Sequence, residues 1–522
     1  MKTSTRPFRR IFVANRGEIA LRIIRACHEL DIEAIQAYSE ADRDSLPVRL
    51  ADGSICVGAP PPSQSYLRID ALIAAARTAK ADAIHPGYGF LSENAAFARA
   101  CDDAGIVFIG PPERAIALMG DKVAARRMAA EAEVPVTPGS PGTLPHAAAA
   151  REVAATLGYP VLLKAAAGGG GRGMRVVHDE AQLAARFTDA AREAQAAFGD
   201  GGLYVEKFLE RVRHVEIQVL CDGENVLHLG ERDCSIQRRN QKLVEESPSP
   251  ALDDAMRARM GEAAVRVCRH VGYRSAGTIE FVVDATSGAF YFMEMNTRVQ
   301  VEHPVTELVT GIDIVKAQIR IAQGERLQIA QGDVRLTGHA LECRINAEDA
   351  ARDFAPSPGE VRALRLPGGP GIRIDSHLFA GYRVPPYYDS LLAKVIAWGR
   401  DRDEAIARMR RAIGEMHVEG VHTTLAFHAR LLADERFRRG DLRTLVSARV
   451  LNEGLDVPDA DVAVIVGGAL GEREHVQRVG RLLRPSEGKR AVVYELVTRN
   501  TIEVGQARRR RQGLVVRRSA QL

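Results

Sequence analysis

The sequence has no hydrophobic run that approaches the roughly 20 residues of a membrane-spanning helix. Its first residues, 1–7, are basic and lead into an expected strand, without the apolar core and cleavage site of a secretory signal peptide. The seven cysteines are an odd number and show no paired spacing, which gives no sign of a disulfide framework. We therefore expect a cytoplasmic protein with reduced cysteines that behave as small buried hydrophobic residues.

A strong charge of either sign is also absent. The formal net charge is +4, so the total charge gives no reason to expect nucleic acid as a partner. The hydrophobic content of 46% and charged content of 26% are those of an ordinary soluble globular protein. A chain of 522 residues has room for roughly three or four domains, each with its own core.

No P-loop occurs, because no glycine run is followed by Lys and Ser or Thr at the start of a helix. The chain instead has a glycine-rich run at 168–173, between expected strands at 159–164 and 175–177. With no helix after the run, a dinucleotide fingerprint is excluded as well. A structureless linker and a lid whose backbone amides close over phosphates both remain possible, and the flanking strands favour the lid.

The stretch 278–306 carries two carboxylates that we expect to face each other. It reads as two strands joined by a short loop of polar and small residues. If Asp284 pairs with Phe290, Glu280 lies opposite Glu294 on the same face. Because directly opposed like charges destabilise an antiparallel pair, the pattern indicates a bound divalent cation.

The same alternation continues beyond the hairpin. Asn296 follows Glu294 by two residues and would add a third oxygen ligand to a magnesium site. Arg298, Gln300 and Glu302 alternate again and would place a cation, an amide and a carboxylate in one row. Apolar strands on both sides favour a functional site over a solvated polar face.

The N-terminal part alternates short apolar strands with amphipathic helices, which is the pattern of a parallel α/β unit. The segment 85–94 follows a strand at the usual ligand edge of such a sheet, and it contains Tyr88 between two glycines. An ordinary turn with a packed tyrosine is the alternative. A new unit begins where Asp121 and Lys122 open a helix, and a third, α+β unit closes near residue 450.

Two polar patterns in the middle of the chain are open to interpretation. His214, Glu216 and Gln218 share one face of an alternating strand. The segment 231–242 is densely polar and has no amphipathic period, so it is either a solvated loop or the lining of a site. Arg344 lies on a later expected strand within 338–349.

Five segments together resemble one enzyme family: 14–20, 85–94, the glycine run, 231–242 and 294–307. They are similar to the biotin carboxylase component of acetyl-CoA carboxylase and of related biotin-dependent carboxylases, in the ATP-grasp superfamily. The resemblance extends from about Phe8 to Asn452. It implies a Rossmann-like parallel-sheet domain at 1–120, an ATP-grasp domain at 121–330 with a lid at about 136–209, and an α+β domain at 336–450.

The resemblance also implies roles for matching residues. For ATP, the matching residues are Lys122, Lys164, Gly168, Gly169, Gly170, Gly171, Glu206, Lys207, Leu209, His214 and Gln237. For bicarbonate they are Lys242, Arg298, Gln300 and Val301. Glu302 matches the general base, Arg344 the arginine that stabilises the biotin enolate, and Tyr88 a wall of the biotin site. The implied ligands of Mg²⁺ or Mn²⁺ are Glu280, Glu294 and Asn296.

The implied activity is the ATP-dependent carboxylation of biotin by bicarbonate through carboxyphosphate, the first half-reaction of acetyl-CoA carboxylase in fatty acid synthesis. The chain has no Met-Lys-Met biotin attachment site and no carboxyltransferase region, so a biotin carboxyl carrier protein and carboxyltransferase subunits are the expected partners. The resemblance also implies a homodimer, and it offers no membrane partner. The same chemistry in a pyruvate, propionyl-CoA or urea carboxylase is the alternative.

Three features depart from the family pattern. Asn240 stands where many relatives have His, and Ala166 and Ala167 stand where Ser and Gly are usual, which makes the first lid hinge stiffer. From about 455 the match ends, and 477–484 resembles the last motif of superfamily 2 helicases. Because a P-loop and an acidic Walker-type box are absent, we interpret 455–522 as a helicase-like fragment. Its basic run at 508–511 is better explained as a solvated tail than as a nucleic-acid site.

Overall fold

The computed structural model describes residues 7–166, 174–238, 241–442, 462–466 and 492–496. The chain forms two compact units, one of residues 1–347 and 358–444 and the other of residues 348–357 and 445–522. The predictions for Gly168, Gly169, Gly170 and Gly171, for Ala167 and Asn240, and for the helicase-like motif lie outside the described residues.

The N-terminal region is a five-stranded parallel sheet in the order β3-β2-β1-β4-β5. Its strands are β1 (Arg10–Val13), β2 (Glu33–Ser39), β3 (Gly53–Gly58), β4 (Ala83–His85) and β5 (Val107–Phe108). Its helices are α1 (Gly17–His28), α2 (Leu46–Leu50), α3 (Ile69–Thr78), α4 (Ala95–Asp103) and α5 (Glu113–Gly120). This confirms the Rossmann-like prediction, although β3 was not predicted because glycines bound it and polar residues interrupt it.

The loops that follow β1 and β4 lie together at the carboxyl edge of the parallel sheet. Asn15 Nδ2 donates to the Pro86 carbonyl at 2.6 Å and to the Tyr88 carbonyl at 2.8 Å. Gly87 has a φ of +63° close to Asn15, a backbone conformation that glycine adopts without strain. This contact places Tyr88 beside the first turn of α1.

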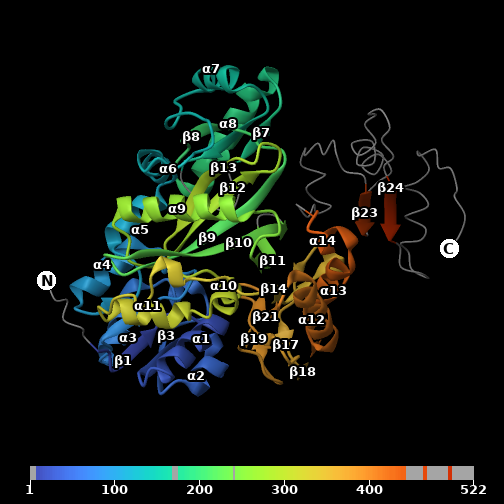
Figure 1. Ribbon diagram of the computed structural model, residues 1–522. Helices are drawn as coiled ribbons and strands as arrows, with labels where there is room; N and C mark the ends of the chain where they lie inside the picture. The colour runs from blue at the N-terminus through green and yellow to red at the C-terminus, as the bar shows by residue number, and fades with distance from the viewer. Residues whose placement is uncertain (1–6, 167–173, 239–240, 443–461, 467–491, 497–522) are drawn as a thin grey trace, which may run out of the picture. The chain divides into compact units, whose positions relative to one another are not determined.

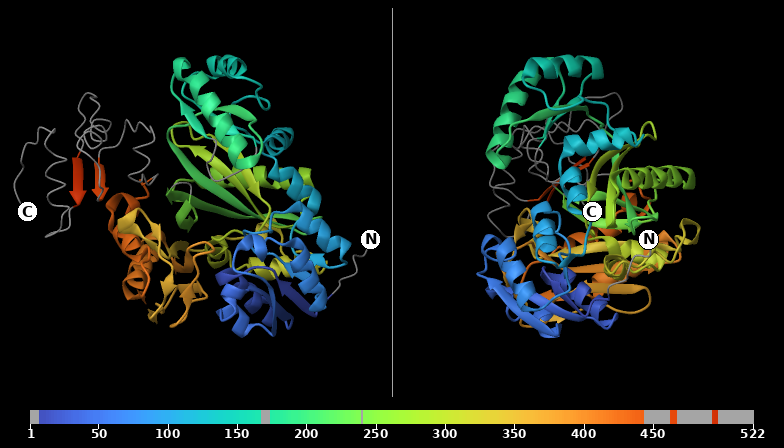
Figure 2. Two further views of the ribbon diagram at one scale, coloured as in Figure 1. Left: turned by 180° about the vertical axis from the view of Figure 1, so that it is seen from behind. Right: turned by 90° about the vertical axis from the view of Figure 1, so that its left-hand side faces the viewer.

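A small three-stranded sheet follows, in the order β7-β6-β8. It consists of β6 (Val161–Ala165), β7 (Arg175–Val177) and β8 (Leu203–Lys207). Helices α7 (Ala147–Leu157) and α8 (Glu180–Phe198) cover one face of it and share one apolar core with it (Figures 1 and 2). Helix α6 (Lys122–Glu131) begins where it was predicted. Asp121 caps it, because its carboxylate accepts from the backbone amides of Val123 and Ala124.

The largest element is an eight-stranded antiparallel sheet in the order β13-β12-β9-β10-β11-β14-β21-β19. The first five strands in this order are β13 (Phe290–Asn296), β12 (Ser275–Asp284), β9 (Val212–Cys221), β10 (Val226–Arg238) and β11 (Gln241–Ser247). The other three are β14 (His339–Asn346), β21 (Leu391–Gly399) and β19 (Ile372–Ser376). The sheet continues through the β11–β14 pair, so the middle and C-terminal parts of this unit share one sheet (Figure 1).

Helix α9 (Asp254–Val271) packs on β9 and β10 and contributes Met260, Ala263 and Val267 to the core of this sheet. Neither of the two interpretations of 231–242 predicted its secondary structure. Most of the segment belongs to β10 and β11, and Arg232 on β10 is fully buried. Its buried polar side chains bond partners on neighbouring elements, as Arg232 does with Glu216 on β9, which is why an amphipathic period is absent.

The β12–β13 hairpin confirms the predicted pair but not the predicted register. Glu280 lies opposite Glu294, whereas Phe290 pairs with Val283 and not with Asp284. A register shift between Glu280 and Phe281 restores the pairing of the two carboxylates. The predicted alternation beyond the hairpin is wrong, because β13 ends at Asn296 and residues 297–302 form a turn that leads into α10 (His303–Thr310).

The remaining elements of this unit are helices and the strands of two two-stranded sheets, β17-β20 and β18-β22. They are α11 (Ile314–Ala322), β17 (Gly359–Glu360), β18 (Ala363–Arg365), β20 (Arg383–Val384), α12 (Arg402–Glu415), β22 (His417–Glu419), α13 (Leu425–Ala433) and α14 (Glu435–Arg438). In the smaller unit, β15 (Glu348–Asp349) pairs with β16 (Ala355–Pro356), and β23 (Val462–Val466) pairs in parallel with β24 (Val492–Leu496). Among the described residues, no helix has the length and apolar character needed to cross a membrane.

Candidate active site

A cavity of about 930 Å³ lies where the N-terminal loops meet the large sheet. Its walls come from the first turn of α1, the loop after β4, strands β12, β13 and β14, and the loop before β21. The predicted residues that line it are Tyr88, Lys122, Lys164, His214, Gln237, Lys242, Glu280, Glu294, Asn296, Arg298, Gln300, Val301 and Arg344. Glu302 lies behind this lining and is fully buried.

Lys242 is the centre of the polar network. Its Nζ lies 2.6 Å from Glu216 Oε2, 2.9 Å from Glu280 Oε1 and 2.7 Å from Glu302 Oε1. Burial alone would lower the pKa of this ammonium, but the three carboxylates outweigh burial and raise its pKa well above the ordinary value. The cation thus holds together one carboxylate from β9, one from β12 and one from the turn before α10.

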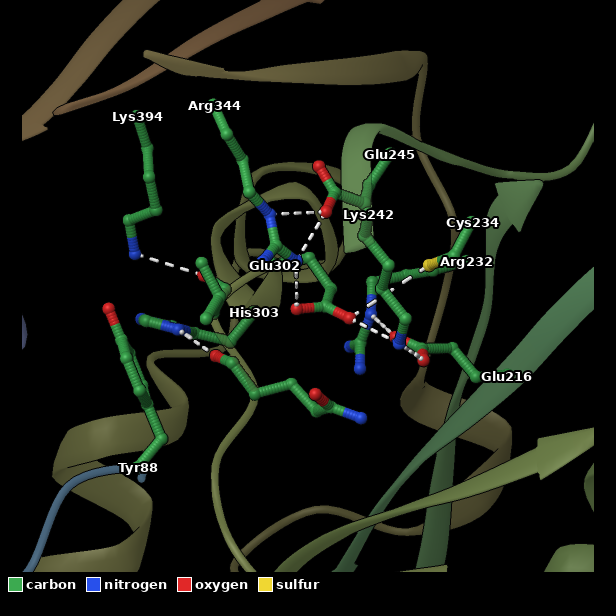
Figure 3. Close-up of polar contacts among 12 residues, drawn as sticks. Tyr88, Glu216, Arg232, Cys234, Lys242, Glu245, Glu302, His303, Arg344 and Lys394 are labelled. Carbon is green, nitrogen blue, oxygen red and sulfur yellow. Dashed lines mark hydrogen bonds and ion pairs between the residues drawn. The ribbon is translucent and has the colours of Figure 1, made fainter. Parts of the chain in front are cut away.

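Glu302 lies between two cations, as Figure 3 shows. Its Oε1 faces Lys242, and its Oε2 accepts from an Arg344 guanidinium nitrogen at 2.9 Å. Burial would raise the pKa of Glu302, but Lys242 and Arg344 hold its pKa well below the usual range. Arg344 also donates from Nε to Glu245 Oε1 at 2.6 Å. Glu302 is therefore an ionised carboxylate at neutral pH, aligned by both neighbours.

In this structure each predicted metal ligand has polar or charged neighbours of its own. Glu280 Oε1 accepts from Asn296 Nδ2 at 2.8 Å, and Glu280 Oε2 lies 2.8 Å from His214 Nε2. Glu294 lies 3.9 Å from the Lys122 ammonium. Burial and repulsion from Glu280 raise the pKa of Glu294, as expected for opposed carboxylates. Two carboxylates and an amide carbonyl are nevertheless the hard oxygen donors that suit Mg²⁺.

The residues predicted for the nucleotide fall into two groups. Lys164, on β6, lies 3.1 Å from Glu206 Oε2, and Arg126 holds the other oxygen of Glu206 at 2.6 Å. Lys207 donates instead to the carbonyls of Gly158 and Tyr159, so it does not join the cavity lining. Leu209 follows β8 in a partly buried loop outside that lining.

The other predicted nucleotide residues, His214 and Gln237, bond each other. Gln237 Nε2 lies 2.8 Å from His214 Nδ1, and it also donates to the Cys234 carbonyl. Burial would lower the pKa of His214, but Glu280 outweighs burial and raises it. The pair therefore connects the carboxylate of Glu280 with the cavity wall.

Three of the residues predicted for bicarbonate lie together. Arg298 donates to Gln300 Oε1 at 3.1 Å, to Asn296 Oδ1 at 3.0 Å and to Glu93 Oε2 at 2.8 Å. Gln300 Nε2 donates to Glu280 Oε1 at 2.9 Å. Val301 lines the cavity beside them. Although they lie in a turn and not on the predicted strand, their side chains still converge on the carboxylate network.

Several residues of the network were missed or left without a role in the sequence. Arg232 is fully buried, and its Nε lies 2.6 Å from Glu216 Oε1. Glu245 holds Arg344, and burial raises its pKa to about 7. Lys394 is a fully buried lysine in the apolar strand β21, and that unusual position was the available signal. The seven cysteines are free, but Cys56 is exposed, which contradicts the expectation that all would be buried.

Comparison with known proteins accounts for this arrangement. The family description "Biotin carboxylase, N-terminal domain" matches residues 7–116, and "Biotin carboxylase C-terminal domain" matches 342–447. Between them, "Carbamoyl-phosphate synthase L chain, ATP binding domain" matches 121–330. The biotin carboxylase of Nostoc sp. is 56% identical over 438 residues, which cover 84% of this chain and 98% of the relative. The chain belongs to the biotin carboxylase family.

Two further members of the family show its breadth. One of the pyruvate carboxylase subunits of Methanothermobacter thermautotrophicus is 48% identical over 486 residues, covering 93% of this chain and 97% of the relative. A solved structure shows the biotin carboxylase domain dimer of Hydrogenobacter thermophilus 2-oxoglutarate carboxylase with MgADP, ADP and bicarbonate. It has 48% identity and a TM-score of 0.80, covering 85% of this chain and 97% of that one. These matches do not support the helicase-like interpretation of the tail.

Proposed function

We propose that this biotin carboxylase family member uses ATP and bicarbonate to carboxylate biotin on a separate carrier protein, as the first half-reaction of acetyl-CoA carboxylase. One observation carries the proposal. Glu302, an ionised carboxylate, lies between Lys242 and Arg344 and directly behind a cavity large enough for a nucleotide. A base, anion-binding cations and phosphate-binding lysines are the groups that this reaction requires.

In the proposed reaction, Glu302 accepts the proton of bicarbonate, while Arg298 and Lys242 compensate its negative charge. The pKa of Glu302 is low because of its two cations, and entry of the bicarbonate anion offsets their charge and makes the carboxylate more basic. A bicarbonate oxygen then attacks the γ-phosphorus, and ADP leaves. Lys122 and Lys164 stabilise the charge that develops on the phosphoryl oxygens.

Carboxyphosphate then breaks its C–O bond to give carbon dioxide and phosphate. Phosphate removes the proton from biotin N1′, Arg344 stabilises the resulting enolate oxygen, and N1′ attacks carbon dioxide. Tyr88 forms a wall of the biotin site. Glu280, Glu294 and Asn296 would hold Mg²⁺, whose charge neutralises the phosphates when it is bound. We place a lid that excludes water at 136–209 and domain boundaries near 120 and 336, and we expect a cytoplasmic homodimer with carrier and carboxyltransferase partners.

The test is a steady-state assay of the purified protein with ATP, Mg²⁺, bicarbonate and free biotin. Release of ADP that requires both bicarbonate and biotin supports the proposal. ADP release that is indifferent to biotin, or that is stimulated by DNA instead, would contradict it.

One observation favours pyruvate, in place of acetyl-CoA, as the final acceptor of the carboxyl group. The match to a pyruvate carboxylase component covers 93% of the chain, against 84% for the Nostoc biotin carboxylase. The biotin chemistry is the same in both cases, and only the final acceptor differs. Reconstitution with the carrier and carboxyltransferase subunits of the same organism, with acetyl-CoA or pyruvate as acceptor, distinguishes the two.

A further inference from the structure

Lys394 lies next to the proposed enolate-stabilising arginine. It is on β21, directly opposite Arg344 on β14, and residues in such a cross-strand pair share one face of the sheet. Arg344 reaches Glu302, whereas Lys394 Nζ donates to the backbone carbonyl of Val301 at 3.0 Å. Two neighbouring cations of one sheet therefore hold two consecutive residues of the turn that carries the base.

Lys394 also reaches the N-terminal region. Its Nζ lies 3.1 Å from Glu18 Oε1, in the first turn of α1. The same carboxylate oxygen accepts a hydrogen bond from the Tyr88 hydroxyl. Figure 3 shows Tyr88 and Lys394 on one side of Glu302, with Glu216 on the other. A series of contacts thus connects the turn at Val301 and Glu302, through Lys394 and Glu18, with Tyr88, the proposed wall of the biotin site.

Glu18 has a further property that points toward the cavity. It lines the cavity and is 3% exposed, and its Oε2 has no hydrogen-bond partner among the residues that the structure describes. A buried carboxylate with a purely structural role normally has both oxygens satisfied. The second oxygen of Glu18 is therefore not used by the fold, which agrees with a role at the cavity wall.

We propose that Lys394 and Glu18 are positioning residues for biotin carboxylation, which fix the Val301–Glu302 turn at a set distance from the Tyr88 wall. This proposal rests on the proposed function and deepens it. Carbon dioxide forms on the Glu302 side of the cavity and must reach biotin on the Tyr88 side before it escapes. A fixed spacing between the two sides keeps ATP use coupled to carboxylation.

The test measures coupling, as carboxybiotin formed per ADP released, in a double variant, Lys394→Met with Glu18→Leu. The double variant removes the 3.1 Å pair as a whole, and Asp375, the second carboxylate near Lys394 at 3.7 Å, keeps its partner Arg373. We expect coupling to fall roughly tenfold or more and the KM for biotin to rise by a similar factor.

The matched control is Arg257→Met with Glu231→Leu. This pair joins α9 to β10 through a 2.7 Å contact, and neither residue lines the cavity. Its removal should lower the melting temperature to a similar extent while coupling stays at the wild-type value. Equal losses of coupling in both double variants, or unchanged coupling and biotin KM in the Lys394 and Glu18 variant, would overturn the proposal.

Glu18→Gln provides a variant that keeps the side-chain size and the acceptor for Tyr88. It weakens only the attraction to Lys394, and we expect a smaller loss of coupling in the same direction. Wild-type protein that fails to carboxylate biotin would refute the proposed function itself. An active wild type with a fully coupled Glu18→Gln protein would refute only the positioning role.

Discussion

Glu302 is the residue at which the charged groups of the site meet. Lys242 and Arg344 approach its two oxygens, and each cation has at least one other carboxylate partner, so the network remains paired when one member changes. The two cations keep Glu302 ionised, and their charge is available to an incoming anion. Removal of the carboxylate should therefore affect the reaction more than the fold.

The Glu302→Gln variant tests this difference. Loss of the general base should lower kcat for biotin-dependent ADP release by about 10²–10⁴-fold. Stabilisation by MgADP in a thermal shift assay should be retained, because that ligand does not need the base. Activity within tenfold of the wild type would exclude Glu302 as the base.

In the β12–β13 hairpin, the carboxylates of Glu280 and Glu294 lie directly opposite each other. Glu280 is surrounded by Lys242, His214 and Asn296, whereas Glu294 has only a distant contact with Lys122 among the described residues. The raised pKa of Glu294 reflects its burial and the repulsion from Glu280. This uneven pairing of the two carboxylates supports the proposal that a cation binds between the strands.

Glu294→Gln should have opposite effects with and without Mg²⁺. Without Mg²⁺ the variant loses one like-charge pair and should melt roughly 1–2 °C higher than the wild type. With Mg²⁺ and ADP it should gain less stability than the wild type does, because one oxygen ligand of the ion is weakened. Melting curves under both conditions provide the check, and an equal ligand-induced shift in both proteins would contradict the assignment of Glu294.

The hairpin also shows which parts of the site the local sequence pattern can predict. Strand alternation and loop length predicted the facing carboxylates, but the structure reaches that pairing through a register shift between Glu280 and Phe281 that the sequence did not predict. The alternation failed beyond Asn296, where a turn and not a strand brings Arg298 and Glu302 to the network. For the polar segment 231–242 the sequence left a solvated loop and a site lining open. Gln237 and Lys242 do line the cavity, but as parts of strands that are stabilised by partners on β9. Lys394 and Glu18 meet only through tertiary packing, and their spacing in sequence carries no sign of it.

Glu246 connects the middle part of the eight-stranded sheet, which ends at β11, with the C-terminal part, which begins at β14. On β11, it lies 2.8 Å from His339 Nε2 at the start of β14 and 2.6 Å from Arg402 Nε at the start of α12. Burial would raise the pKa of Glu246, but His339 and Arg402 lower it from 4.5 to about 2. That difference corresponds to about 3 kcal/mol of stability at neutral pH.

The lowered pKa of Glu246 makes the stability of the fold depend on pH. A carboxyl group whose pKa is lower in the folded state stabilises the fold above its unfolded pKa of 4.5, and the stabilisation disappears as the pH falls toward 2. Glu246→Gln should therefore unfold at a lower urea concentration at pH 7, and its stability should decline less between pH 5 and pH 3. Parallel wild-type and variant curves over this range would contradict the role of the pair.

The second unit of the chain raises the question of whether the tail belongs to the enzyme. The residues that line the cavity lie between Asn15 and Leu391 in the sequence. Removal of 455–522 should leave biotin-dependent ADP release within about twofold of the full chain, a difference well below 1 kcal/mol in the barrier. A large loss of activity in the shortened chain would show that the tail supports the structure of the site.

The most direct test of the proposed mechanism follows the oxygen atoms of bicarbonate. The purified protein is supplied with ATP, Mg²⁺, biotin and ¹⁸O-labelled bicarbonate, and the phosphate and carboxybiotin are examined by mass spectrometry. Because a bicarbonate oxygen attacks the γ-phosphorus, each phosphate should carry one ¹⁸O, and carboxybiotin should form along with it. Phosphate without ¹⁸O, or no carboxybiotin, would contradict the activation of bicarbonate at Glu302.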